Sequence, residues 1–211
     1  MSATVVLLHG LWMHPWVMTR LDNHLSAAGY QVIAPNYPTV QASPAANAEA
    51  IYQSLQQTTL GNELHIIGHS LGGLVALHLL SRHPELPAGK LLTLGTPAQG
   101  SCIARFFQDM PVFNAAFGQS LEQGLSGEAV PNTIQRPWGA VIGTLPVGLG
   151  APFLVGKGAH DGAVLVSEAE HSAQTERLYL PVSHSAMLFS PVVSQAALQF
   201  LNTGKFTQPV D

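Results

Sequence analysis

Short runs of apolar residues alternate along the chain with longer segments in which apolar residues recur at helical spacing. The short runs predict six strands, and the longer segments predict the helices between them. The predicted strands cover residues 4–8, 31–34, 63–68, 90–95, 139–144 and 177–181. The predicted helices cover residues 16–28, 44–58, 71–83 and 191–203, with a long helical region over residues 101–126.

The predicted strands are apolar at successive positions, so both of their faces are expected to be buried. Such strands are typical of a parallel sheet that helices cover on both sides, with right-handed connections. Two helix starts are marked clearly, because Ser43-Pro44 and Ser190-Pro191 each offer a capping hydroxyl followed by a proline suited to the first turn. The pattern predicts an α/β sandwich.

Length and composition narrow the class of protein. The 211 residues suit a single domain over residues 1–211, and no Pro- or Ser-rich linker divides them. Only 9% of the residues are charged and the net charge is about -4, which argues against nucleic acid as a partner. The sequence leaves the oligomeric state unknown.

Cysteine use and apolar run length bear on the compartment. The one cysteine, Cys102, excludes an intramolecular disulfide, and the first strand starts without a preceding leader-like segment. The longest apolar runs fall short of the roughly 18 residues that a spanning helix needs. We therefore expect a cytoplasmic protein without a transmembrane segment.

Ten histidines raise the question of a metal site. The chain has no H-E-x-x-H or C-x-x-C motif and no cluster of histidine and carboxylate at a repeated helical spacing. We expect no metal and no other cofactor.

A candidate nucleophile stands between the third predicted strand and the helix that follows it. The segment Gly68-His69-Ser70-Leu71-Gly72 has the form G-x-S-x-G, which is weak evidence by itself. The position of this motif at a strand-to-helix turn strengthens the evidence for a nucleophile. Such a turn exposes a serine in a strained conformation, and the flanking glycines leave room for it. Ser70 is therefore the predicted nucleophile.

The partners of Ser70 are expected after later strands, because the chemistry of an open parallel sheet gathers beyond the carboxyl ends of its strands. Asp161 is the only aspartate directly after the fifth strand, and His184 lies in the loop after the sixth. We predict Asp161 as the acid and His184 as the base. The alternative for Asp161 is an ordinary turn residue, and the alternative for His184 is a solvated loop histidine. The substitute candidates for the acid are Asp109, Glu122 and Glu128, and those for the base are His160 and His171.

The developing oxyanion needs backbone N–H donors. One is expected from Leu71, directly after the nucleophile, and a second from Leu11 in the loop that His9-Gly10 begins after the first strand. The alternative for His9-Gly10 is a simple turn that ends the strand.

These motifs together resemble the α/β-hydrolase superfamily, in particular its compact lipase-like and esterase-like members. The resemblance rests on Leu8-His9-Gly10, residues 68–72, the segment from Gly95 to Ser101, Asp161-Gly162 and His184, in that family's order of nucleophile, acid and histidine. It implies a six-stranded, mostly parallel sheet flanked by helices on both faces, without the two N-terminal edge strands usual in the family. The chain departs from many relatives by carrying Ala98 where they have histidine.

Residues 101–130 are long enough for a small helical flap over the site. Aromatic residues of this region and of the first loop are candidates for substrate binding, and packing in the core is the equally weighted alternative. The candidates are Trp12, Phe106, Phe107 and Phe113.

The predicted function is hydrolysis of a carboxylic ester or lipid, a small-molecule substrate with an uncharged acyl group, through an acyl-enzyme on Ser70. An acyltransferase, a thioesterase and an amidase would use the same residues, and the sequence does not separate them. A catalytically inert binding protein of the same fold is a further alternative. A haloalkane dehalogenase would need a carboxylate at the position of Ser70. The natural substrate and its acyl length are not determined by the sequence.

Overall fold

In the computed structural model, which describes residues 3–132 and 134–206, six strands form one sheet whose described pairings are all parallel. The strands are β1 (Thr4–Leu8), β2 (Gln31–Ile33), β3 (Leu64–His69), β4 (Leu91–Leu94), β5 (Trp138–Gly143) and β6 (Glu176–Leu180). Their spatial order is β2-β1-β3-β4-β5-β6. All six predicted strands are confirmed, with bounds that shift by at most one residue. The side chains of residues 112–114 lie outside the description.

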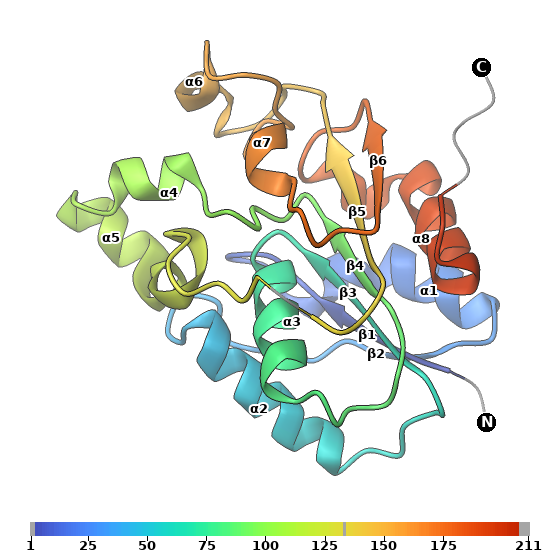
Figure 1. Ribbon diagram of the computed structural model, residues 1–211. Helices are drawn as coiled ribbons and strands as arrows, with labels where there is room; N and C mark the ends of the chain where they lie inside the picture. The colour runs from blue at the N-terminus through green and yellow to red at the C-terminus, as the bar shows by residue number, and fades with distance from the viewer. Residues whose placement is uncertain (1–2, 133, 207–211) are drawn as a thin grey trace.

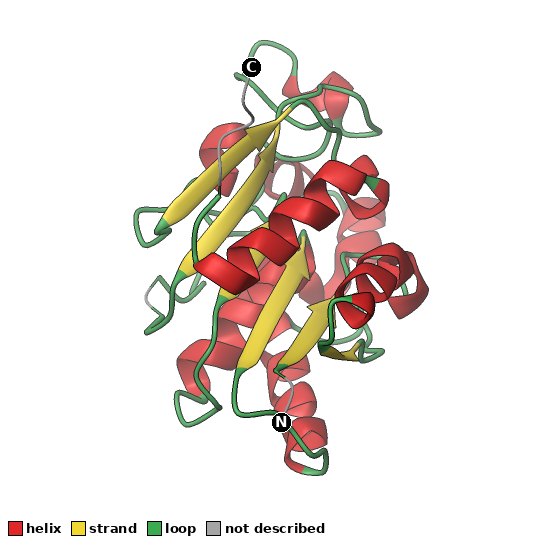
Figure 2. Ribbon diagram, turned by 90° about the vertical axis from the view of Figure 1, so that its right-hand side faces the viewer, coloured by secondary structure: helices red, strands yellow, loops and turns green. Residues whose placement is uncertain are grey.

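Helices cover both faces of the sheet (Figures 1 and 2). On one face lie α2 (Pro44–Gln56) and α3 (Leu71–Arg82), and on the other lie α1 (Thr19–Ala27) and α8 (Pro191–Thr203). The predicted helix over residues 16–28 begins as a short 3-10 turn, η1 (Pro15–Met18). The predicted layer arrangement is therefore confirmed.

The strand β1 shows why the strands have apolar residues at successive positions. Its side chains alternate between two core clusters: Val6 and Leu8 pack with α2 and α3, whereas Val5 and Leu7 pack with α1 and α8. All four side chains are fully buried, since each face of the strand meets a helical layer.

The two predicted helix starts are present with the expected caps. The hydroxyl of Ser43 accepts a hydrogen bond from the Ala46 amide, and the hydroxyl of Ser190 accepts one from the Val193 amide. In each case a proline occupies the first turn, where its missing N–H leaves no bond unmade.

The region over residues 101–126 is broken into pieces rather than forming one helix. It contains α4 (Cys102–Phe107), α5 (Pro111–Phe117), η2 (Gly118–Ser120) and the distorted turn η3 (Leu121–Leu125). Three further short elements were not predicted, namely α6 (Ala151–Leu154), α7 (Val166–Ala169) and η4 (Ala186–Phe189). Segments of four residues are too short to display a helical period.

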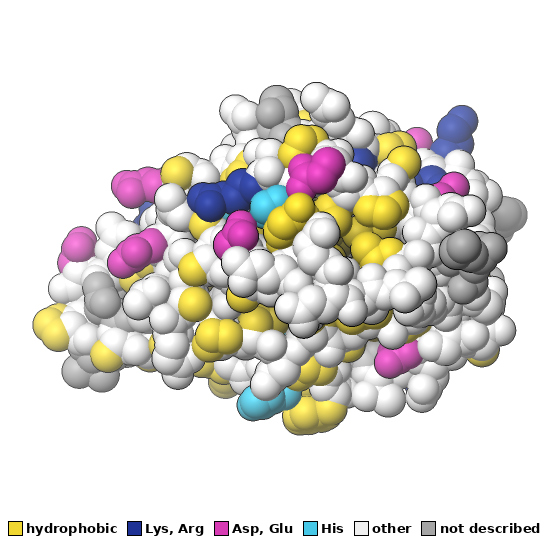
Figure 3. Space-filling model, turned by 90° about the horizontal axis from the view of Figure 1, so that it is seen from below, with side chains coloured by type: hydrophobic (Ala, Val, Ile, Leu, Met, Phe, Trp, Pro, Cys, Tyr) yellow, Lys and Arg dark blue, Asp and Glu magenta, His cyan; other side chains and the backbone are white. Residues whose placement is uncertain are grey.

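The described part of the chain contains no helix with the length and apolar character required to cross a bilayer. On the face seen in Figure 3, Lys and Arg side chains lie among acidic ones, and no broad basic area covers that face. The absence of nucleic acid as a partner stays a prediction from composition.

Candidate active site

Ser70 lies at the sharp turn between β3 and α3 and has φ 54° and ψ -123°. A side chain at positive φ is strained, and such strain is typical of an exposed nucleophile at a strand-to-helix turn. The neighbouring glycines are required by space, because a Cβ on Gly72 would lie 2.2 Å from the carbonyl oxygen of Leu8. A Cβ on Gly68 would lie 2.5 Å from the Gly73 backbone. The strand β3, the helix α3 and the strand β1 therefore meet too closely here for larger residues.

The backbone of Ser70 is fixed by neighbours on both sides of the turn. Its amide donates to the carbonyl of Leu94 at 2.9 Å, which ties the turn to the end of β4. Its carbonyl accepts from the Gly73 amide at 3.0 Å, which starts the turn of α3. The side chain of Ser70 is half-buried.

Asp161 and His184 form a buried pair. The Nδ1 atom of His184 lies 2.7 Å from Oδ2 of Asp161. His184 is 9% exposed and Asp161 is 1% exposed. The other carboxylate oxygen accepts from the amides of Ala163 and Val164 at 2.9 and 2.8 Å. A carboxylate with these donors holds the imidazole with its hydrogen on Nδ1, which leaves Nε2 as a proton acceptor.

Gly95 shows that this pair lies next to the turn that carries Ser70. A Cβ on Gly95 would be 3.0 Å from both Oδ2 of Asp161 and Nδ1 of His184. Gly95 directly follows Leu94, whose carbonyl binds the Ser70 amide. Gly95 has φ 56°, so both its conformation and the space beside it favour glycine. The sequence pattern placed Gly95 at the end of the fourth predicted strand and gave it no role of its own at the site.

His69 provides a second link between the turn and His184. Its Nε2 atom donates to the His184 carbonyl at 3.0 Å, and the two rings have centroids 4.7 Å apart. Burial, together with the smaller effect of the neighbouring His184, lowers the pKa of His69 to about 3. His69 is therefore neutral at ordinary pH and acts as a fixed donor to the loop that carries His184. A lone histidine inside G-x-S-x-G gave no sequence signal for this contact.

The loop after β1 passes beside Ser70, as the predicted oxyanion donor requires. A Cβ on Gly10 would lie 3.2 Å from Cβ of Ser70. Residues 10–13 form a turn in which the Met13 amide donates to the Gly10 carbonyl, while Trp12 adopts φ 59°. Among the described residues, the backbone amide of Leu11 has no acceptor. It remains available to bind a ligand.

Leu71 is the first residue of α3, so its N–H belongs to the donors that a helix leaves without an intrahelical acceptor. This end of a helix also favours negative charge. The geometry is compatible with Leu11 and Leu71 as a donor pair, which remains a prediction.

The four predicted substrate-binding aromatics lie in different surroundings. Trp12 is 62% exposed beside Phe117. Phe107 is buried, and its ring lies 4.9 Å from that of Phe153. Phe106 is exposed, and its ring centroid lies 6.5 Å from that of Phe153 in α6. The side chain of Phe113 lies outside the described residues. A role in substrate binding stays a prediction for all four.

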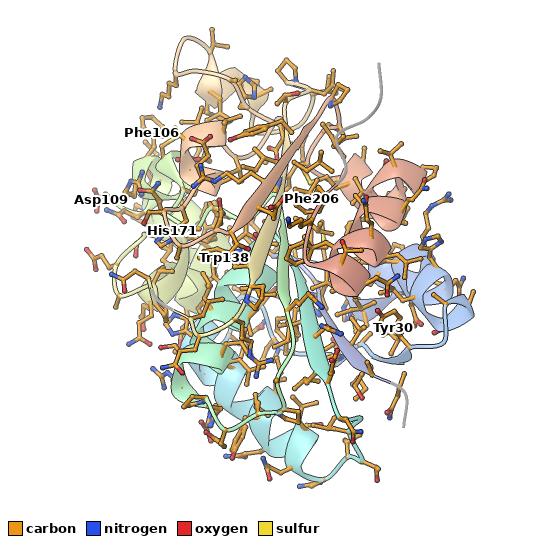
Figure 4. The ribbon with its side chains drawn as sticks, turned by 45° about the vertical axis from the view of Figure 1, so that its right-hand side comes forward. Tyr30, Phe106, Asp109, Trp138, His171 and Phe206 are labelled. Carbon is orange, nitrogen blue, oxygen red and sulfur yellow. The ribbon has the colours of Figure 1, made fainter. Side chains whose placement is uncertain are left out.

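The substitute acids and bases lie in other contacts. His171 stacks on the buried Trp138, with ring centroids 5.1 Å apart, as Figure 4 shows. The Nδ1 atom of His160 accepts from the Gly162 amide at 3.1 Å. Asp109 lies at the outer edge of the molecule (Figure 4). Within the part of the chain that the structure describes, no group of three or more His, Cys, Asp or Glu residues is arranged to hold a metal ion.

Comparison with known proteins agrees with this architecture. A family model described as alpha/beta hydrolase fold matches residues 3–101. The mature lipase BlEst2 of Bacillus licheniformis superimposes with a TM-score of 0.73 at 16% identity, over 95% of this chain and 91% of that chain. The chain therefore has the α/β-hydrolase fold, and the resemblance inferred from its motifs is confirmed.

Two curated relatives are similar in sequence over part of their length. The chain is 30% identical over 137 residues to a pimeloyl-[acyl-carrier protein] methyl ester esterase of Chromobacterium violaceum, which covers 63% of this chain and 50% of the relative. It is 29% identical over 119 residues to a triacylglycerol lipase of Pseudarthrobacter phenanthrenivorans, which covers 50% of this chain and 36% of the relative. The chain thus spans half or less of the length of these curated relatives.

Proposed function

We propose that the protein is a serine hydrolase that cleaves carboxylic esters through an acyl-enzyme on Ser70. The observation that carries the proposal is the position of the Asp161–His184 pair. Oδ2 of Asp161 and Nδ1 of His184 would each lie 3.0 Å from a Cβ on Gly95. Gly95 directly follows Leu94, whose carbonyl accepts a hydrogen bond from the Ser70 amide. The described contacts include no hydrogen bond between the Ser70 hydroxyl and His184, so the proposal requires Nε2 of His184 to reach that hydroxyl when substrate binds. A strained serine bonded to an oriented imidazole is the arrangement that activates a hydroxyl nucleophile.

In the proposed mechanism, Nε2 of His184 takes the proton of the Ser70 hydroxyl as the oxygen attacks the ester carbonyl. The same imidazole then gives that proton to the leaving alcohol, and water repeats the sequence to release the acid. Asp161 fixes the hydrogen on Nδ1 and stabilises the protonated ring. No step requires a cofactor.

The negative charge on the tetrahedral intermediate is proposed to be bound by the backbone amides of Leu11 and Leu71. A donor of this kind contributes about 3 kcal/mol of transition-state stabilisation. The approach of Gly10 to Ser70 supports this role, because it brings the first loop beside the Ser70 side chain.

The names of the relatives support the substrate class. One is named a methyl ester esterase and the other a triacylglycerol lipase. An acyltransferase, a thioesterase or an amidase would use the same acyl-enzyme, and the identity of the acceptor separates them. Product analysis with water alone and with added alcohol, thiol or amine acceptors distinguishes hydrolysis from transfer.

Labelling with a fluorophosphonate tests the proposal. We expect one adduct, on Ser70, and turnover of 4-nitrophenyl esters that labelling abolishes. The variant Ser70→Ala should lose both label and turnover and keep its folded circular dichroism spectrum. The matched control is Ser54→Ala, at an exposed position of α2, which should keep both. A folded wild-type protein that takes no label and turns over no ester would show an inert binding protein instead.

The cytoplasmic location remains a prediction that rests on composition and cysteine use. Fractionation of cells that express the chain from its own gene checks it. Recovery in an extracellular or membrane fraction would contradict it.

A further inference from the structure

A cavity of about 460 Å³ opens beside the loop that carries Leu11. Two segments line it, residues 12–14 after β1 and residues 36–41 after β2. Its volume falls within the range of small-molecule sites, and both segments follow the carboxyl ends of strands, where ligands bind in parallel sheets.

Met13 connects this cavity to the nucleophile. Its sulfur atom and Cβ of Ser70 each lie within 3.3 Å of the same point, the Cβ position of Gly10. Met13, which lines the cavity, therefore also lies close to the Ser70 side chain. A substrate bound at Ser70 can extend past this flexible side chain into the cavity.

Hydrogen bonds from three segments hold the cavity walls together. The Trp12 amide donates to the hydroxyl of Thr39 at 3.0 Å, and the Trp12 indole donates to the Ala116 carbonyl at 2.9 Å. The Gln119 amide donates to the Val40 carbonyl at 2.8 Å. The cavity is thus a formed site, since the loop after β1, the loop after β2 and the end of α5 support one another.

Strand order decides which part of an ester this cavity receives. Ser70 follows β3, the cavity walls follow β1 and β2 on one side, and Asp161 and His184 follow β5 and β6 on the other. The leaving oxygen must lie toward His184, because that imidazole protonates it. The acyl group then extends in the opposite direction, toward the cavity.

The side chains at the cavity indicate the chemistry of that acyl group. Trp12, Met13 and Val40 offer apolar surface, whereas the amides of Asn36 and Gln41 are exposed and bond to no other described residue. The lining residues, all in the described part of the chain, include no Asp, Glu, Lys or Arg.

We propose that this cavity is the acyl subsite and that it selects acyl groups with an apolar stem and an uncharged hydrogen-bonding group, such as an amide or a hydroxyl, farther along. This inference rests on the proposed function.

The test compares two esters with the same leaving group. These are 4-nitrophenyl N-acetyl-6-aminohexanoate, which carries an amide in its acyl chain, and 4-nitrophenyl nonanoate, which matches its length. The wild type should have the higher kcat/KM for the amide ester. Gln41→Leu and Asn36→Leu should each lower the ratio of kcat/KM for the amide ester to kcat/KM for the nonanoate about three- to tenfold, the effect of one lost hydrogen bond. The control Gln56→Leu, at the far end of α2, should change neither kcat/KM value.

In a second pair of esters with alcohols of equal length, the amide is on the alcohol instead: 6-acetamidohexyl acetate is compared with nonyl acetate. The Gln41→Leu variant should leave the ratio of the kcat/KM values for these two acetates unchanged. If only this second ratio changes, the cavity receives the alcohol and the acyl assignment is wrong. If Ser70 takes the label and the nonanoate is hydrolysed but neither ratio responds to Gln41 or Asn36, the subsite inference fails alone. If no ester is turned over and no label is taken up, the proposed function itself fails.

Discussion

Asp161 and His184 are joined twice, by a 2.7 Å contact between Oδ2 and Nδ1 and by a 2.8 Å hydrogen bond from the His184 amide to the Asp161 carbonyl. The side-chain contact sets the tautomer of the imidazole, and the backbone bond fixes the loop that carries it. Orientation of the base therefore depends on both bonds, and a substitution can remove one without the other.

The variant Asp161→Asn removes the side-chain contact selectively. Asparagine keeps an oxygen that can accept from the amides of Ala163 and Val164, but its NH₂ group cannot accept the Nδ1 hydrogen. We expect kcat for ester hydrolysis to fall by about 10⁴-fold, the scale of a wrong imidazole tautomer, with little change in the melting temperature. Steady-state kinetics and thermal unfolding measure the two effects.

The matched control is Asp109→Asn, at an exposed position, which should change neither quantity. An Asp161→Asn variant that keeps more than a tenth of the wild-type kcat would remove Asp161 from the proposed mechanism.

Gly95→Ala should disturb the same pair from another direction. Its Cβ would lie 3.0 Å from both Asp161 Oδ2 and His184 Nδ1, at a positive φ. Gly29→Ala isolates the backbone strain, because Gly29 has φ 93° and no atom within 4 Å of its Cβ position. We expect both variants to lose about 1 kcal/mol or more of unfolding free energy, and only Gly95→Ala to lose activity. Equal activity in the two variants would contradict the tight packing inferred at Gly95.

The sheet and the order of the candidate site residues could be predicted from the sequence because both follow from local signals. The strand β3 and helix α3 have clear apolar patterns, and glycines around Ser70 mark the turn. The rule that ligands lie beyond the carboxyl ends of parallel strands then selected Asp161 and His184 from chemically equivalent residues elsewhere. The pairing of these two is present in the structure, while their catalytic roles remain to be tested.

The cavity could not be predicted in this way because its walls come from contacts between distant segments. The bond from the Trp12 indole to the Ala116 carbonyl spans 104 positions in sequence. Nothing in the local pattern of residues 36–41 indicates that they meet Trp12. The aromatic residues of α4 carried a helical pattern, but a pattern does not show that Phe107 packs on Phe153.

Buried histidines predict how stability depends on pH. Burial lowers the pKa of His69 to about 3, and burial, reinforced by Lys90, lowers the pKa of His65 to about 4. The unfolded chain binds protons on these groups near pH 6.5, so between about pH 6.5 and 4 it holds more protons than the folded chain. The free energy of unfolding should therefore fall as the pH is lowered through this window.

His65→Gln isolates one of these groups. Glutamine can still accept from the Lys90 amide, as Nδ1 of His65 does at 3.0 Å, but it takes up no proton. Urea unfolding at pH 7 and pH 5 should show a smaller loss of stability for the variant than for the wild type. The exposed His14→Gln should follow the wild type. If His65→Gln loses as much free energy of unfolding between pH 7 and pH 5 as the wild type does, this explanation is refuted.

Trp12→Phe should loosen the predicted flap over residues 101–130. Phenylalanine can keep a ring against Phe117, where the indole centroid lies 5.6 Å away, but it loses the donor to the Ala116 carbonyl. We expect amide hydrogen exchange over α5 and η2 to quicken about two- to tenfold, the scale of one hydrogen bond. The control Trp16→Phe changes a tryptophan that is 70% exposed, so it should leave exchange there unchanged. If exchange stays at the wild-type rate in Trp12→Phe, other contacts hold this segment. If it quickens and ester turnover changes with it, the segment takes part in opening the site.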